Sequence, residues 1–155
     1  MANTWQDTLA DTAATEALGA ALGRALVPGA VIYLTGDLGA GKTTLVRGLL
    51  RQLGFEGVVR SPTYTLVEPY RVGDWALIHL DLYRIADPEE LENLGLRDQL
   101  DGATVVLVEW PARGTGHLPT PDLDVLLTHQ DPGRGVCIKA ATPRGGNILG
   151  KIADN

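Results

Sequence analysis

Blocks of apolar residues recur along the chain at spacings that predict helices alternating with buried strands. Residues 11–26 place leucines at helical spacing, which indicates an amphipathic helix. Residues 30–35 form a continuous apolar run, typical of a strand buried on both faces. Residues 43–53 direct leucines to one side and arginines to the other, and Gly54 supplies a stop, so we expect a second helix there.

Later segments indicate more strands and the start of another helix. Strand-like patterns occur at residues 64–70, 75–82, 104–109, 122–128 and 135–141. The last two flank Asp131-Pro132-Gly133, which predicts a closing hairpin, and Asp87 before Pro88 is typical of a helix N-terminus. Strands that alternate with helices predict an α/β fold of three layers, with helices on both faces of a mostly parallel central sheet and some antiparallel edge strands. We expect a single domain over residues 1–155, because no linker or repeat interrupts the pattern.

Composition narrows the class of protein. Hydrophobic residues make up 45% of the 155 residues, enough for one core, and no apolar run is long enough to cross a membrane. No signal peptide is expected at the N-terminus, and Cys137, the single cysteine, fits a reducing cytoplasm. We expect the Cys137 thiol to be buried and structural. A net charge of −6 with only three lysines argues against independent binding of a nucleic-acid backbone.

A glycine-rich octet lies between the predicted buried strand and the second helix. It reads Gly36, Asp37, Leu38, Gly39, Ala40, Gly41, Lys42 and Thr43. This is the pattern of a P-loop in its strand–loop–helix setting, where backbone N–H groups and a helix N-terminus face phosphate oxygens. We expect Lys42 to contact the β- and γ-phosphates of ATP, Thr43 to bind Mg²⁺, and Thr44 to serve the α-phosphate. The predicted fold is therefore P-loop NTPase-like.

A P-loop site also needs an acidic residue at the end of a neighbouring strand, to hold or orient Mg²⁺ and its waters. Glu109 ends one unbroken apolar strand and Asp81 ends another, and ligands gather at the carboxyl ends of parallel strands. We therefore expect both near the loop, the alternative for each being a strand-end surface carboxylate. Trp110, held by the proline after it, either lines the site or packs in the core. His79 is expected to be a hydrogen-bonded core residue.

The segment Arg60-Ser61-Pro62-Thr63-Tyr64-Thr65 is rich in hydroxyl groups and follows the P-loop helix, where many P-loop proteins have a switch loop. Such a loop would meet the γ-phosphate and Mg²⁺. A simple turn before a strand is the alternative.

Other functions of a P-loop chain stay open at this point. A small-molecule kinase would need a lid with several arginines, and between the strands only Arg84 and Arg97 occur, widely separated. A GTPase would need a guanine-reading Asn-Lys-x-Asp motif, which the sequence lacks. A non-enzymatic scaffold that binds nucleotide for assembly would have less need of two acids.

Six motifs occur in an order that resembles one known family. They are GDLGAGKTT (36–44), SPTYTLVEPY (61–70), HLDLYR (79–84), DPEELENLG (87–95), VEWP (108–111) and GRGV (133–136). Together they resemble the bacterial TsaE (YjeE) family of ATPases over nearly the whole chain. The resemblance implies a Mg²⁺-dependent ATPase that supports threonylcarbamoyladenosine formation in tRNA, as an accessory to the TsaB–TsaD complex. ATP hydrolysis would reset that complex, and tRNA would be contacted only indirectly through the partners.

The resemblance also implies roles for individual residues. Thr43 and Glu109 would bind Mg²⁺, and Asp81 would assist hydrolysis. Trp110 would lie beside the nucleotide, and Thr65 would belong to a switch-like segment. Thr12 and Arg134 would flank the adenine. Hydrolysis is expected to be slow for the isolated chain and faster with partners, because P-loop sites often need a group supplied in trans.

Overall fold

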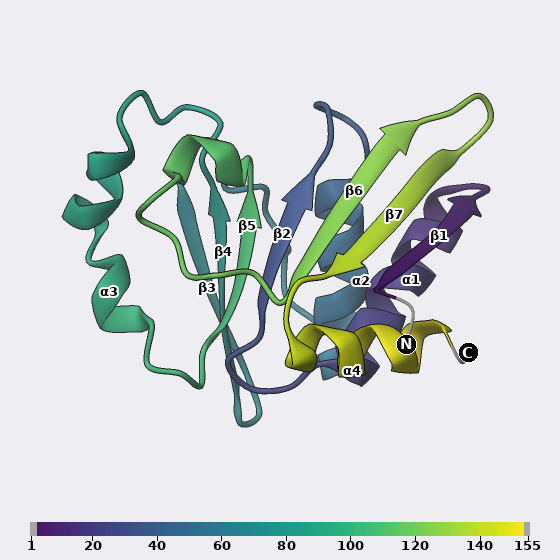
Figure 1. Cartoon of the computed structure of the whole chain (residues 1–155), viewed down its shortest axis with the longest axis horizontal. Coiled ribbons are helices and arrows are strands. Elements are labelled where there is room, and N and C mark those ends of the chain that lie inside the picture. The colour runs from purple at the N-terminus through teal and green to yellow at the C-terminus, as the bar shows by residue number, and fades with distance from the viewer. Residues whose placement is uncertain (1–2, 154–155) are drawn as a thin grey trace.

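Seven strands form a single mixed sheet, and the computed structural model describes residues 3–153 (Figure 1). The strands are β1 (Thr4–Leu9), β2 (Val31–Thr35), β3 (Val67–Val72), β4 (Trp75–Asp81), β5 (Val105–Glu109), β6 (Leu123–His129) and β7 (Arg134–Ala140). Their order is β1-β7-β6-β2-β5-β4-β3. Strands β6, β2, β5 and β4 run parallel, whereas β3, β7 and β1 pair antiparallel toward the edges. The predicted mostly parallel centre with antiparallel edges is confirmed; residues 1–2 and 154–155 of the predicted domain lie outside the described residues.

Two apolar cores, one on each face of the sheet, hold the helices in place. The helical elements are α1 (Thr12–Ala25), α2 (Lys42–Leu53), η1 (Pro88–Leu94), α3 (Leu96–Gln99), η2 (Pro111–Gly114) and α4 (Pro143–Ala153). Helices α1, α2 and α4 share one core with the inner residues of β2, β5, β6 and β7. The short elements η1 and α3 cover the other face over β2, β5 and β4, where Leu91 and Leu96 belong to the same core as Val106. The predicted three-layer fold is confirmed, and no helix within residues 3–153 is long and apolar enough to span a membrane.

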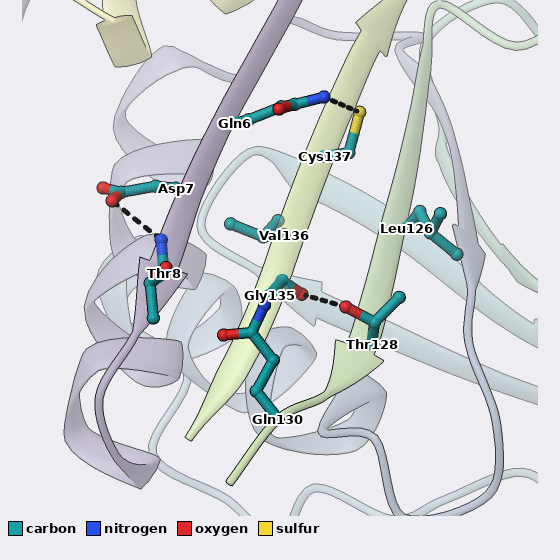
Figure 2. A pocket seen from close by; sticks show the side chains of 9 residues that line it. All are labelled: Gln6, Asp7, Thr8, Leu126, Thr128, Gln130, Gly135, Val136 and Cys137. Atoms are coloured by element: carbon teal, nitrogen blue, oxygen red, sulfur yellow. Dashed lines mark hydrogen bonds between the residues drawn. The ribbon is translucent and has the colours of Figure 1, made fainter. Parts of the chain in front are cut away.

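The second face of the sheet is not covered over its whole width. Over β1, β7 and β6 it carries a hollow of about 370 Å³, whose lining residues Figure 2 shows. Cys137 points into this hollow, half-buried, with its sulfur 3.7 Å from the Gln6 amide nitrogen. The expectation of a buried thiol was therefore wrong, because the alternation of β7 turns Cys137 away from the core that receives Val136 and Ile138.

Several local predictions are confirmed, and one strand is displaced. Gly54 ends α2 with φ 104°, and Asp87 accepts the amide of Glu89 at the start of η1, which is a 3₁₀ helix. The strand expected at 64–70 instead spans Val67–Val72. Residues before it form turns, in which the Leu66 amide donates to the Pro62 carbonyl at 2.8 Å and Leu66 has φ 68°. Strand β1 and helix α4 had no counterpart in the sequence prediction.

A buried aspartate fastens α4 to the start of β2. Asp122 is 2% exposed and accepts the Val31 amide at 2.8 Å and the Thr142 hydroxyl at 2.6 Å, while Arg144 lies 3.1 Å away. Burial opposes ionisation of Asp122, but the bonds from Thr142 and Val31 and the charge of Arg144 outweigh it and hold its pKa below the usual range. The C-terminal helix is thus attached through hydrogen bonds as well as apolar contacts.

Candidate functional site

The glycine-rich octet forms the turn between β2 and α2. Gly41 precedes the first helical residue with φ 110°, a conformation that favours glycine, and it offers no side chain to cap the helix. The first amides of α2 are therefore free to face a ligand, with the positive end of the helix dipole behind them. Ahead of Gly41 the loop turns tightly, since the Ala40 amide donates to the Asp37 carbonyl at 3.0 Å. Leu38 at the tip of this turn is 59% exposed.

Lys42 is the first residue of α2, and its side chain is only 5% exposed. Its ammonium group donates to the Gly36 carbonyl at 2.6 Å and lies 3.6 Å from a carboxylate oxygen of Glu109. The same nitrogen lies 4.3 Å from the centre of the Trp110 ring. A buried ammonium group held by its own loop and by one carboxylate has the charge that suits an anionic ligand.

Two carboxylates end neighbouring parallel strands beside the lysine. Asp81 ends β4 and Glu109 ends β5, the two residues are partners in the sheet register, and each is 3% exposed. Asp81 accepts the Thr63 hydroxyl at 3.1 Å and the Tyr83 amide at 3.0 Å. Neither acid is a surface carboxylate, so that alternative is excluded for both.

These groups surround one pocket of about 200 Å³. It is lined by Leu38, Gly39, Gly41, Lys42, Thr43, Thr44, Ser61, Thr63, Asp81 and Glu109. The pocket thus joins the glycine-rich loop, the start of α2, the hydroxyl-rich segment and both strand ends. Within residues 3–153 there is no group of three or more His, Cys, Asp or Glu that would hold a metal ion without help. The oxygen donors of Thr43, Asp81 and Glu109 nevertheless suit Mg²⁺, which is commonly held by one or two carboxylates together with substrate phosphates.

A second hollow, of about 290 Å³, lies on the other side of the loop and shares Gly39, Gly41 and Thr44 with the first. Thr12 and Arg134 both line it, one at the start of α1 and the other at the start of β7. The loop is therefore a wall common to both hollows. The residues that line the two hollows together reach from the two acids to the helix start at Thr12.

Arg134 also holds the glycine-rich loop through hydrogen bonds to its backbone. Its guanidinium donates to the backbone carbonyls of Ala40 at 3.1 Å, Gly39 at 3.2 Å and Gly133 at 2.8 Å. The ring of His129, the register partner of Arg134 in the same hairpin, lies 3.3 Å from the Leu38 carbonyl. The hairpin of β6 and β7 thus holds the loop in shape, a connection that sequence spacing alone did not reveal.

Two predicted residues lie beyond the pocket lining. Trp110 has φ 57°, contacts the Tyr83 ring at a tilt of 51° with ring centres 5.0 Å apart, and reaches the site through its contact with Lys42. Thr65 does not line either hollow, and its hydroxyl donates to Glu68 at 3.2 Å. From the hydroxyl-rich segment it is Ser61 and Thr63 that reach the pocket. A contact between Thr65 and a nucleotide stays a prediction.

His79 was expected in the core, and it is fully buried beneath the pocket. Its Nε2 atom lies 2.6 Å from Glu109, which confirms the expected hydrogen bond. The partner of that bond was not foreseen, because nothing in the sequence pairs a residue of β4 with the end of β5.

Comparison with known proteins gives a consistent result. A family described as "Threonylcarbamoyl adenosine biosynthesis protein TsaE" matches residues 9–136. The tRNA threonylcarbamoyladenosine biosynthesis protein TsaE of Haemophilus influenzae is 47% identical over 124 residues, which cover 80% of this chain and 78% of that protein. The protein of the same name from Nostoc sp. is 44% identical over 129 residues, or 81% of this chain and 78% of the relative.

A solved structure extends the match to the whole fold. The crystal structure of Bacillus subtilis YdiB superimposes with a TM-score of 0.85 and 29% identity, covering 100% of this chain and 99% of the other. The family match over residues 9–136 includes every residue that lines the pocket. The chain therefore belongs to the TsaE family, whose members are named for threonylcarbamoyladenosine biosynthesis in tRNA.

Proposed function

We propose that the protein is a Mg²⁺-dependent ATPase that supports threonylcarbamoyladenosine formation in tRNA. The observation that carries the proposal is the buried Lys42 ammonium, held between the loop carbonyl of Gly36 and Glu109. In the structure, the Lys42 ammonium is satisfied by groups of its own site. A triphosphate would offer it a stronger, doubly charged partner within the same pocket.

Different residues around the pocket would bind the phosphates, hold the metal ion and orient the attacking water. Loop amides and Lys42 would bind the phosphates, and the Thr44 amide would serve the α-phosphate. Thr43 and Glu109 would hold Mg²⁺, which when bound neutralises charge that develops on the phosphates. Asp81, whose carboxylate is already held by Thr63 and the Tyr83 amide, would orient the attacking water.

The second hollow is the natural place for the adenosine moiety. It adjoins the phosphate pocket through Gly39, Gly41 and Thr44, and its walls include Thr12 and Arg134. Trp110 would contribute beside the phosphates, on the far side of Lys42. Thr65 would approach only after the hydroxyl-rich segment rearranges.

The partners are homologues of TsaB and TsaD, and the compartment is the cytoplasm. A net charge of −6 with few lysines supports a chain that leaves tRNA contact to those partners. A small-molecule kinase is disfavoured, because Arg84 and Arg97 are too widely separated in the sequence to form an arginine-rich lid. A scaffold that only binds nucleotide is disfavoured by the two buried carboxylates, Asp81 and Glu109.

Release of inorganic phosphate from ATP tests the catalytic half of the proposal. Wild-type protein should turn over in Mg²⁺, and Lys42→Ala should lose at least about 100-fold of that rate, because phosphate charge is left uncompensated. Lys139→Ala, which removes an exposed lysine of β7, is the matched control and should leave the rate unchanged. Equal rates for wild type and Lys42→Ala would refute the assignment.

The same assay with added TsaB and TsaD homologues tests the accessory role. The isolated chain should be slow, and the partners should raise its rate. Fast turnover alone, with no response to the partners, would refute the accessory role while leaving the ATPase intact.

A further inference from the structure

His79 lies in the middle of β4, directly beneath the two acids, and no part of its side chain is exposed. Its Nε2 atom is 2.6 Å from Oε2 of Glu109, whereas Nδ1 is buried without a hydrogen-bond partner among the described residues. Glu109 is thus the one polar contact that the structure gives this ring. An ionised carboxylate only accepts hydrogen bonds, so Nε2 carries the proton and donates it.

This bond separates the two oxygens of Glu109. Oε2 is held by His79 below, and Oε1 is the oxygen that faces Lys42 at 3.6 Å. If Lys42 turns from the Gly36 carbonyl toward a phosphate, Oε1 becomes the free oxygen at the pocket. The carboxylate cannot rotate without breaking the short bond to His79.

Packing and strand pairing do not explain a histidine at this position. Strands β4 and β5 are already joined by their backbone ladder, in which His79 is the register partner of Leu107. On the same face of the sheet, Leu77 and Leu107 are aliphatic and buried in the core. An aliphatic residue at 79 would pack as well and would spare the core an unpaired ring nitrogen, which costs stability.

We infer that His79 is a positioning residue that holds Glu109 with one oxygen directed at the metal. This inference rests on the proposed Mg²⁺-dependent ATPase and adds a residue to its machinery. Side chains that orient a metal ligand are typically needed for full metal affinity, at a level of about 10- to 100-fold.

Two substitutions separate positioning from packing. His79→Leu keeps an apolar side chain of similar size but removes the donor, and His79→Gln keeps an N–H donor of similar reach. The measurement is the affinity for ATP at increasing Mg²⁺, followed by calorimetry, together with the turnover rate. His79→Leu should need about 10- to 100-fold more Mg²⁺ than wild type to reach the same ATP affinity and turnover rate. Its ATP affinity without Mg²⁺ should equal that of wild type. His79→Gln should recover part of the lost response to Mg²⁺.

Two further variants supply the controls. His117→Leu removes a histidine that lies 3.1 Å from Glu92, away from the pocket, and should leave the Mg²⁺ response unchanged. In a Glu109→Gln background, His79→Leu should add little further loss, because both changes act through the same carboxylate.

The outcomes distinguish this inference from the proposed function. If wild type hydrolyses ATP and His79→Leu depends on Mg²⁺ to the same degree as wild type, the role of His79 is overturned and the ATPase stands. If wild type shows no turnover, the proposed ATPase itself is overturned. A loss of ATP affinity that is equal with and without Mg²⁺, and alike in both variants, overturns positioning in favour of packing.

Wild-type protein gives an independent answer should His79→Leu fail to fold. The ring nitrogens of His79 are then followed by NMR during addition of ATP, first without and then with Mg²⁺. A shift of the Nε2 signal that requires Mg²⁺ supports the inference, because its acceptor carboxylate has met a cation. An unchanged signal contradicts it.

Discussion

Helices α1 and α2 touch so closely at Gly19 that any side chain there has no room. A Cβ atom built on Gly19 would lie 2.1 Å from the carbonyl oxygen of Leu45 and 2.9 Å from the amide of Leu49. Both are backbone atoms of α2, which cannot rotate away as a side chain would. Gly19→Ala therefore forces the helices apart by about 1 Å, against the close packing of a protein core.

The expected effect on stability follows from two opposing terms. Alanine favours a helix over glycine by about 1 kcal/mol. Overpacking a core costs about 1–3 kcal/mol, and the upper end applies here because only backbone can move. The net effect is a loss of about 2 kcal/mol, equivalent to a fall in Tm of about 4–8 °C for a chain of this length.

A glycine elsewhere in the chain provides the matched control. Gly150 lies on the exposed side of α4, and a Cβ atom there would meet nothing within 4 Å. Gly150→Ala should raise stability by up to about 1 kcal/mol. Urea unfolding followed by circular dichroism measures both variants. If Gly19→Ala is as stable as Gly150→Ala, the close contact of α1 and α2 is refuted.

Three further predictions concern the site and its support. Glu109→Gln should lower Mg²⁺-dependent phosphate release by about 100-fold while ATP affinity without Mg²⁺ changes little; equal loss of both would contradict a metal role. Arg134→Met should weaken ATP binding about tenfold in calorimetry, because the carbonyls of Gly39 and Ala40 lose charged donors worth about 1–3 kcal/mol; unchanged affinity would show that these hydrogen bonds are dispensable. The pKa of Asp122 lies below its ordinary value of 3.8, so its carboxylate stabilises the fold fully above that pH, and the contribution is lost as the pH falls through the folded-state value. Asp122→Asn should therefore destabilise the chain by about 1–3 kcal/mol near neutral pH and flatten the acid limb of a plot of urea midpoint against pH; a limb as steep as that of wild type would contradict the assignment.

The strand–loop–helix around Lys42 was predictable because each of its signals is local. An apolar run, three glycines and a following leucine pattern depend only on neighbouring residues, so their structure can be inferred without knowledge of tertiary contacts. The two acids were predictable for a related reason, since each ends an apolar run, and parallel strands bring such ends together.

Elements whose stability comes from distant partners were missed. Strand β1 has the sequence TWQDTL, in which the exposed, charged Asp7 stands between Trp5 and Leu9, so it shows no clean apolar alternation. It becomes a strand because β7 supplies a register partner for each of its residues. In α4 three glycines obscure the spacing of Ile148, Leu149 and Ile152, although Thr142 caps its start by accepting the Gly145 amide.

The same reasoning explains the parts of the site that the sequence left undefined. Hydrogen bonds from Arg134 to the glycine-rich loop span 94 and 95 residues, and the bond between His79 and Glu109 spans 30. Such pairs leave no periodic pattern in the sequence, so they can be predicted only once the order of the strands in the sheet is known. Leu66, with φ 68°, delays the start of the strand that was predicted from residue 64, and no residue type announced that conformation.

We propose above that the loop of residues 36–43, with Lys42, holds the phosphates of Mg·ATP. A crystal structure of the wild-type chain with Mg²⁺ and a non-hydrolysable ATP analogue tests it most directly. We predict a triphosphate along the loop amides, Lys42 released from the Gly36 carbonyl, and the metal ion beside Thr43 and Glu109. A loop left empty at saturating nucleotide, or phosphates bound elsewhere on the chain, would contradict it.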